Sequence, residues 1–228
     1  MTTCWYFFLS KRLRNKDNKK VIQLFEAILA LTGICIFSLF IHRDSLLIII
    51  AFIGLILTAL SINNAFYNLQ SPGLIFGITP FYKKVIYYSI TGFLFGGILG
   101  ILYRYTNGNS ILPATLTKIA IVAPIIGIAE ELVFRGFIQG RAGIFGPSFS
   151  VIFAAAGHTL YKYLVLKLLP VDIGINFLLL IILTMVVGII LGILREVSKN
   201  VIPPSLAHAC FDILVYGGLS TAPVWVWF

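Results

Sequence analysis

The sequence predicts an all-α integral membrane protein, a polytopic bundle of about seven to eight transmembrane helices. Of its 228 residues, 59% are apolar and only 11% are Asp, Glu, Lys or Arg, whereas an ordinary soluble domain has about 25% charged residues. The 17 basic and 8 acidic side chains are too few to cover the surface of a soluble globule of this length. The composition therefore excludes a soluble cytosolic enzyme.

Six apolar segments approach the roughly 20 residues that a helix needs to cross a hydrocarbon core about 30 Å thick. They cover residues 21–41, 45–62, 85–104, 147–167, 173–194 and 201–219. A seventh segment, 115–138, is equally long but carries charged residues. Polar turn residues at 63–64 and 70–73 separate a piece at 74–82, which we expect to be interfacial or re-entrant. A single membrane domain, 1–228, accounts for all of these segments.

The distribution of basic residues predicts the orientation. Six of the 17 Lys and Arg residues lie in the run at 11–20, directly before the first apolar segment. With the basic segment 1–20 in the cytoplasm, the inner loops hold eleven Lys and Arg residues, and the outer loops hold four: Arg43, Arg104, Lys162 and Lys167. This asymmetry favours a cytoplasmic N-terminus and an outer C-terminus, where Trp225 and Trp227 would form an aromatic belt. The basic run also suits anionic lipid headgroups, so no nucleic-acid partner is expected.

Acidic residues interrupt the apolar segments at four positions, namely Glu26, Glu130, Glu131 and Asp212. A charged side chain at mid-bilayer costs about 2.5 to 3.5 kcal/mol on insertion scales, so each needs a partner, a water-filled cavity or a function. His158 and His208 lie in predicted spans as well. Glu26 has no partner in the layer of the other groups, and we expect it to snorkel toward its membrane end.

Depth brings three of these positions together. Counting 1.5 Å per residue from the cytoplasmic helix ends, Glu130, His158 and His208 would each lie about 12 to 17 Å into the membrane. Three different helices would thus place titratable side chains in the same layer, toward the cytoplasmic half. We therefore regard 115–219 as the catalytic helices.

Helical spacing divides these groups into pairs. His208 and Asp212 are four residues apart and share one helix face, and the same spacing pairs Glu131 with Arg135. Glu130 points about 100° away from Glu131 and has no local cation. One carboxylate is thus predicted to be neutralised and the other to be free.

A free carboxylate in a low-dielectric site is suited to act as a general base near neutral pH, and Glu130 is the candidate. His158 would orient or protonate the reacting groups, while His208 and Asp212 would bind a developing oxyanion or the attacking water. These groups would support attack of a glutamate-activated water on a carbonyl. A structural alternative exists for each side chain alone: Glu131 with Arg135 as a structural ion pair, and the others as buried hydrogen-bonding groups.

The pattern resembles the CPBP family of CAAX proteases and bacteriocin-processing intramembrane proteases, typified by the type II CAAX prenyl endopeptidase. The matching motifs are Glu130-Glu131-x-x-x-Arg135-Gly136, the histidine motif from Phe153 to His158, and His208-x-x-x-Asp212. The resemblance implies that Glu130 activates water, that Glu131 and Arg135 support the site, and that His158, His208 and Asp212 complete it. It also implies a membrane-associated peptide or protein substrate, with prenylation of that substrate left open.

Two features of the motifs differ from the family pattern. Ala154 stands four residues before His158, where the family usually has Phe. The last motif ends in Asp212, which cannot donate an amide hydrogen bond to an oxyanion and would instead orient His208 or ligate a metal.

A metal cofactor is the first open alternative. Glu130, His158, His208 and Asp212 would supply carboxylates and imidazoles acceptable to zinc, and the family has often been labelled metalloprotease. However, no His-Glu-x-x-His helix is present to preset two ligands on one face. We therefore prefer a mechanism without a cofactor.

Two other functions also fit intramembrane polar residues. An ion- or proton-coupled transporter would use the same Glu, His and Asp side chains as a relay. No internal repeat of the kind common in transporters is visible between the halves. A catalytically silent scaffold or immunity protein is the third class, but every polar position expected of an active member is filled.

Overall fold

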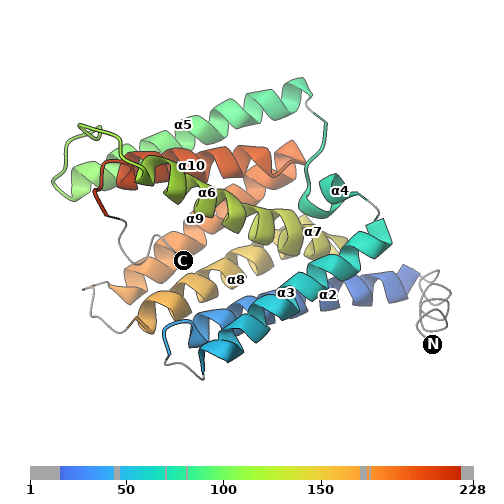
Figure 1. Ribbon diagram of the computed structural model, residues 1–228. Coiled ribbons are helices and arrows are strands. Elements are labelled where there is room, and N and C mark those ends of the chain that lie inside the picture. The colour runs from blue at the N-terminus through green and yellow to red at the C-terminus, as the bar shows by residue number, and fades with distance from the viewer. Residues whose placement is uncertain are drawn as a thin grey trace.

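The computed structural model describes residues 16–43, 47–69, 71–80, 82–169, 174 and 176–221, and these residues form helices and connecting loops without strands (Figure 1). The long helices are α2 (Lys16–Phe40), α3 (Ile48–Leu69), α5 (Lys83–Thr106), α8 (Pro147–Lys167) and α9 (Phe177–Ser198). The shorter ones are α4 (Pro72–Phe76), α6 (Ile119–Glu131), α7 (Gln139–Ala142) and α10 (Ile202–Tyr216), with a π-helix η1 (Leu132–Ile138) and a 3-10 turn η2 (Gly143–Phe145). The all-α prediction is confirmed.

Five helices in the described residues are long and apolar enough to cross a membrane. Their apolar stretches are Lys19–Phe40, Ile48–Phe66, Lys83–Thr106, Pro147–Lys167 and Phe177–Ser198, close to five of the predicted spans. Many large apolar side chains on these helices point away from the protein. In lipid such exposure carries no hydrophobic penalty, so the bundle suits a bilayer.

The two remaining predicted spans have a different form. The predicted segment 115–138 is helical only from Ile119, through α6 and η1, and the helical path continues beyond it through α7. The predicted segment 201–219 is α10, which has only 15 residues. Fifteen residues rise about 22 Å, less than the hydrocarbon thickness. Both elements pack one face against the bundle, and they carry the polar side chains described below.

The bundle is built from pairs of closely packed helices. The most extensive contacts join α10 with α5, α2 with α3, α8 with α9 and α10 with α6 (Figure 1). The apolar stretch of α8 is 56% buried, against 22% for α5 and for α9, so α8 is the most central of the long helices. A Cβ atom at Gly92 or Gly96 of α5 would collide with the backbone carbonyls of Pro203 and Ala207 on α10, so these glycines permit the close α5–α10 packing.

The predicted interfacial or re-entrant piece is a short helix followed by an anchored loop. Gly77 ends α4 with a φ of 66°, a left-handed conformation that favours glycine. The Val201 N–H donates to Gly77 O at 3.0 Å, and Asn200 Nδ2 donates to Thr79 O at 3.0 Å. These bonds fasten the loop to the α9–α10 junction.

The prediction that Glu26 snorkels is wrong. Its side chain is only 2% exposed, its Oε2 lies 2.9 Å from Arg141 Nε, and Asn64 Nδ2 donates to its Oε1 at 2.7 Å. We call Glu26, Asn64 and Arg141 the Glu26 clasp, because they join α2, α3 and α7. The clasp also gives Asn64 a buried partner, which explains why α3 continues to Leu69 instead of ending at 62.

Most of the described basic residues that the sequence counted with the loops lie within helices, and two of these contact buried glutamates. Arg141 belongs to α7 and Lys162 to α8, and both form ion pairs with buried glutamates. Removing one from the inner count and one from the outer count leaves the direction of the charge asymmetry unchanged. Residues 11–15 of the basic run and both Trp225 and Trp227 lie outside the described residues.

Candidate active site

The structure brings all six predicted site residues together where α6, η1, α8 and α10 meet. With Lys162 they form a network that we call the Glu130 cluster: Glu130, Glu131, Arg135, His158, Lys162, His208 and Asp212. Glu130, Glu131, Arg135, His158 and Asp212 are at most 7% exposed. The side chains of Lys162 and His208 are 19% and 17% exposed, so they are the most accessible members.

Glu130 contacts two side chains of α8, one through each carboxylate oxygen. His158 Nε2 lies 3.1 Å from Glu130 Oε2, and Lys162 Nζ forms an ion pair with Glu130 Oε1. His158 and Lys162 are four residues apart and therefore share one face of α8. Glu130 is thus held between an imidazole and an ammonium of one neighbouring helix.

The prediction that Glu130 is free of a cation is corrected by this ion pair. Sequence reasoning searched for a cation at helical spacing on the same helix and found none. Lys162 comes from α8, which the sequence does not pair with α6. The spacing of His158 and Lys162 was the signal that would have found it, once His158 was placed beside Glu130.

Glu131 occupies the centre of the second half of the cluster. Its Oε1 accepts from Arg135 Nη1 at 3.1 Å, which confirms the predicted pair, and lies 3.0 Å from His208 Nδ1. A carboxylate only accepts hydrogen bonds, so His208 donates through Nδ1. Glu131 therefore links η1 to α10.

Arg135 joins the two halves and fixes the proton on His158. The same Nη1 that donates to Glu131 lies 3.0 Å from His158 Nδ1. Guanidinium groups have no acceptor, so His158 must accept at Nδ1 and carry its proton on Nε2. His158 then donates from Nε2 to Glu130 Oε2, which orients the carboxylate.

The π-helix η1 follows directly after the paired glutamates. It runs from Leu132 to Ile138 and contains Arg135. Such wider turns inside α-helices occur frequently at functional sites. Here η1 places Arg135 within reach of both Glu131 on its own helical path and His158 on α8. The sequence did not predict this irregularity.

Asp212 lies beside His208, as their spacing predicted. Its Oδ2 is 3.8 Å from His208 Nε2, which is too long for a direct hydrogen bond. Gly127 of α6 faces the same pair, because a Cβ atom there would collide with Asp212 Oδ2 and lie 2.9 Å from His208 Cδ2. The absence of a side chain at Gly127 therefore leaves room beside His208 and Asp212.

Aromatic rings enclose His158. The Phe134 ring centroid lies 4.6 Å from that of His158, and the Tyr161 ring stacks on it at 6.2 Å with an interplanar angle of 16°. Phe153, the aromatic residue of the histidine motif, stacks with Phe149 at 5.6 Å. Sequence reasoning missed Phe134 and Tyr161, because their contacts depend on how η1 packs against α8.

The four side chains considered as zinc ligands do not present a fitting set. A ligating histidine usually donates its second N–H to an acceptor, but His158 Nδ1 faces the guanidinium of Arg135, which is a donor. The proton of His158 then sits on Nε2, toward Glu130, where a metal would need a lone pair. Among the described residues, no three His, Cys, Asp or Glu side chains are grouped so as to hold a metal ion.

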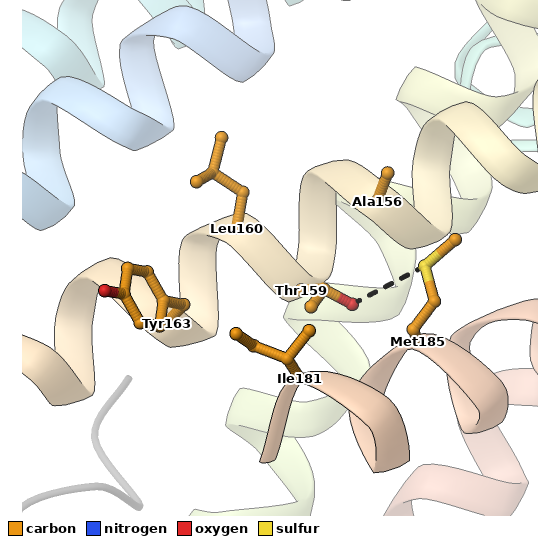
Figure 2. Close-up of a pocket in the computed structure, with 6 residues that line it drawn as sticks. All are labelled: Ala156, Thr159, Leu160, Tyr163, Ile181 and Met185. Carbon is orange, nitrogen blue, oxygen red and sulfur yellow. Dashed lines mark hydrogen bonds between the residues drawn. The ribbon is translucent and has the colours of Figure 1, made fainter. Parts of the chain in front are cut away.

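An apolar pocket of ≈ 300 Å³ lies between α8 and α9 (Figure 2). It is lined by Ala156, Thr159, Leu160, Tyr163, Ile181 and Met185. Figure 2 shows the Thr159 hydroxyl directed at Met185 Sδ, 3.9 Å away. No member of the Glu130 cluster lines this pocket, so it is distinct from the polar site.

Comparison with known proteins identifies the family that this arrangement resembles. Residues 112–214, slightly under half of the chain, match the family model described as type II CAAX prenyl endopeptidase Rce1-like, and this match confirms the resemblance that the motifs predicted. The matched region contains every member of the Glu130 cluster. Comparison with curated proteins and with solved structures gave no match. The fold and the family match together support a multi-pass membrane protein and a CAAX-type intramembrane endopeptidase in general.

Proposed function

We propose that the chain is an intramembrane endopeptidase that hydrolyses a peptide bond of a membrane-associated peptide or protein with a water activated by Glu130. The observation that carries this proposal is the burial of Glu130 against His158 and Lys162 inside the region that matches the endopeptidase family. The family match also favours hydrolysis over the transporter and scaffold alternatives.

Glu130 retains acceptor capacity for a water in this geometry. Its two oxygens offer about four lone-pair sites, and His158 and Lys162 use one on each oxygen. The water would give a proton to Glu130 while its oxygen bonds to the carbonyl carbon, and the carbonyl π electrons would move to oxygen. The protonated Glu130 would then return that proton to the amine nitrogen as the C–N bond breaks.

The other members of the cluster would position the reacting groups. His158, whose Nε2 donates to Glu130, would orient the base, and Arg135 would hold His158 in that tautomer. The 3.8 Å separation of His208 Nε2 and Asp212 Oδ2 suits a bridging water, which can donate to both atoms. Glu131 would anchor both Arg135 and His208. No cofactor enters these steps.

The decisive experiment is cleavage of defined peptides by the purified full chain in lipid. Prenylated peptides and matched unprenylated peptides would be incubated with the protein, and the products would be identified by mass spectrometry. Cleavage at one defined bond by the wild type and its loss in Glu130→Gln would support both the activity and the base. A folded wild-type protein that cleaves none of the membrane-bound peptides would contradict the proposed activity.

The proposed orientation places the N-terminus and the site toward the cytoplasm, because the basic run at 11–20 favours that side. Cys4 should then react with a membrane-impermeant thiol reagent only from the cytoplasmic side. A cysteine introduced by Trp227→Cys should react only from outside. Cys4 and Trp227 lie outside the described residues, so labelling is the direct measurement, and the reverse pattern would contradict the orientation.

A further inference from the structure

Lys162 has a place in the Glu130 cluster that the predicted motifs do not explain. Its ammonium forms an ion pair with Glu130 Oε1, and it lies 5.5 Å from the centroid of the Tyr161 ring. The side chain is 19% exposed, whereas that of Glu130 is 8% exposed. The cation therefore lies between the buried base and the accessible side of the cluster.

The charge balance of the proposed reaction changes around this cation. Before the reaction, the negative charge is on Glu130. When Glu130 takes a proton from water, its carboxyl group becomes neutral, and an equal negative charge appears on the substrate carbonyl oxygen. The attraction between Lys162 and Glu130 therefore weakens at the moment when the oxyanion forms next to it.

The geometry allows the ammonium to follow the charge. The water that Glu130 activates must lie about 3–3.5 Å from the carbonyl carbon, so the oxyanion forms within a few ångströms of Glu130. The Lys162 ammonium is on a flexible four-carbon stem with three rotatable donors, and Tyr161 offers its ring face as a second contact. Asp212 cannot supply this donor while it is ionised.

We propose that Lys162 is a catalytic residue that pairs with Glu130 in the resting protein and binds the oxyanion of the tetrahedral intermediate. This inference rests on the endopeptidase activity proposed above. Lys162 keeps its three protons throughout, and no bond to it forms or breaks. When the C–N bond breaks and Glu130 returns its proton to the amine, the ammonium returns to the carboxylate.

The test compares Lys162→Met with the wild type on a peptide that the wild type cleaves. Loss of one oxyanion donor typically lowers kcat by about 10²- to 10³-fold. We expect a loss of that size in kcat with little change in KM, because the contact is made in the transition state. The matched control is Lys167→Met, which removes an exposed lysine of the same helix whose ammonium contacts the Phe177 ring. That variant should retain wild-type kcat.

A chemical rescue separates the charge from the packing of the side chain. In a background with Cys4, Cys35 and Cys210 changed to alanine, Lys162→Cys should be slow. Alkylation with 2-bromoethylamine places an ammonium at nearly the length of lysine and should restore most of kcat. Thermal unfolding of Lys162→Cys, measured before and after alkylation, shows whether kcat recovers because the fold is stabilised or because the charge is restored. The rescue therefore tests the role of the charge even if Lys162→Met does not fold.

The outcomes distinguish this inference from the proposed function. A wild-type kcat in Lys162→Met, a loss confined to KM, or alkylation of Lys162→Cys without recovery would each overturn the role of Lys162 while the endopeptidase activity stands. A wild type that cleaves no peptide would overturn the proposed function itself, and with it this inference.

Discussion

In the part of the chain that the structure describes, two buried clusters contain carboxylates, and they differ in the groups that surround them. In the Glu26 clasp, the carboxylate contacts a guanidinium and an amide, and neither exchanges protons near neutral pH. In the Glu130 cluster, two carboxylates contact two imidazoles and an ammonium as well as a guanidinium. Each cluster also has a more exposed edge, formed by Lys162 and His208 in the Glu130 cluster and by Asn64 in the clasp.

A buried intramembrane carboxylate therefore does not by itself indicate a catalytic site. The cost of placing a charge in the membrane requires a partner in either case, and an ion pair supplies it. Proton-exchanging imidazole neighbours are what separate the Glu130 cluster from the clasp. The comparison predicts that equal substitutions in the two clusters will have different consequences.

The largest expected effect is that of Glu130→Gln on cleavage. The amide keeps the shape of the side chain but cannot accept the proton of water, so the rate should fall by about 10²- to 10⁴-fold. Activity per folded molecule, measured with the peptide panel, is the appropriate quantity. Turnover close to that of the wild type would remove Glu130 from the mechanism.

Glu26→Gln should have the opposite profile. It leaves Arg141 buried without its carboxylate partner, and breaking one side of a buried ion pair typically costs about 3–5 kcal/mol of stability. We expect a lower unfolding temperature and unchanged activity per folded molecule. The double change to Glu26→Met with Arg141→Met should recover stability, because it leaves no unpaired charge. A loss of turnover in folded Glu26→Gln protein would contradict the proposal that the Glu26 clasp is structural and the Glu130 cluster is catalytic.

How much the sequence could predict differs between these clusters for a physical reason. Pairs at helical spacing, such as Glu131 with Arg135 and His208 with Asp212, follow from the repeat of one helix and were predicted. Equal depth correctly suggested that Glu130, His158 and His208 would meet. The partners of Glu130 and Glu26 come from other helices, and the sequence does not determine which helix faces pack together. Lys162 and Arg141 were therefore not recognised as partners of buried glutamates, and Glu26 was expected to snorkel.

Helix geometry was predictable where the apolar pattern is long and regular. The span at 147–167 agrees with α8 at both ends, because Pro147 occupies the first turn of the helix, where proline is favoured, and Pro170 follows shortly after its last residue. The π-helix η1 was not predicted, because its wider turn is stabilised by contacts of Arg135 and Phe134 with α8 rather than by local sequence. The extension of α3 past 62 likewise depends on a partner from α2.

A smaller effect is expected from Gly127→Ala. The new Cβ would collide with Asp212 and press on His208, and overpacking of this kind typically costs about 1–3 kcal/mol. Because the displaced side chains belong to the Glu130 cluster, we expect lower turnover together with a modest loss of stability. Gly97→Ala is the matched control, since its Cβ would meet Cys210 Sγ at an ordinary 3.6 Å. Equal turnover in the two variants would show that the space beside His208 and Asp212 is not used.

The smallest expected effect is that of chelators. In the Glu130 cluster, the Nδ1 lone pair of His158 accepts from Arg135, and its Nε2 proton is donated to Glu130. Neither ring nitrogen therefore has a lone pair with which to bind a metal ion that Glu130 also binds. Lys162 adds a positive charge beside the carboxylate, which opposes binding of a divalent cation there. We therefore expect cleavage to continue in strong chelators, and elemental analysis of active protein to give substoichiometric zinc. Stoichiometric zinc whose removal stops turnover, and whose return restores it, would require His158 to leave Arg135 and would place the Glu130 cluster in the class of metal sites.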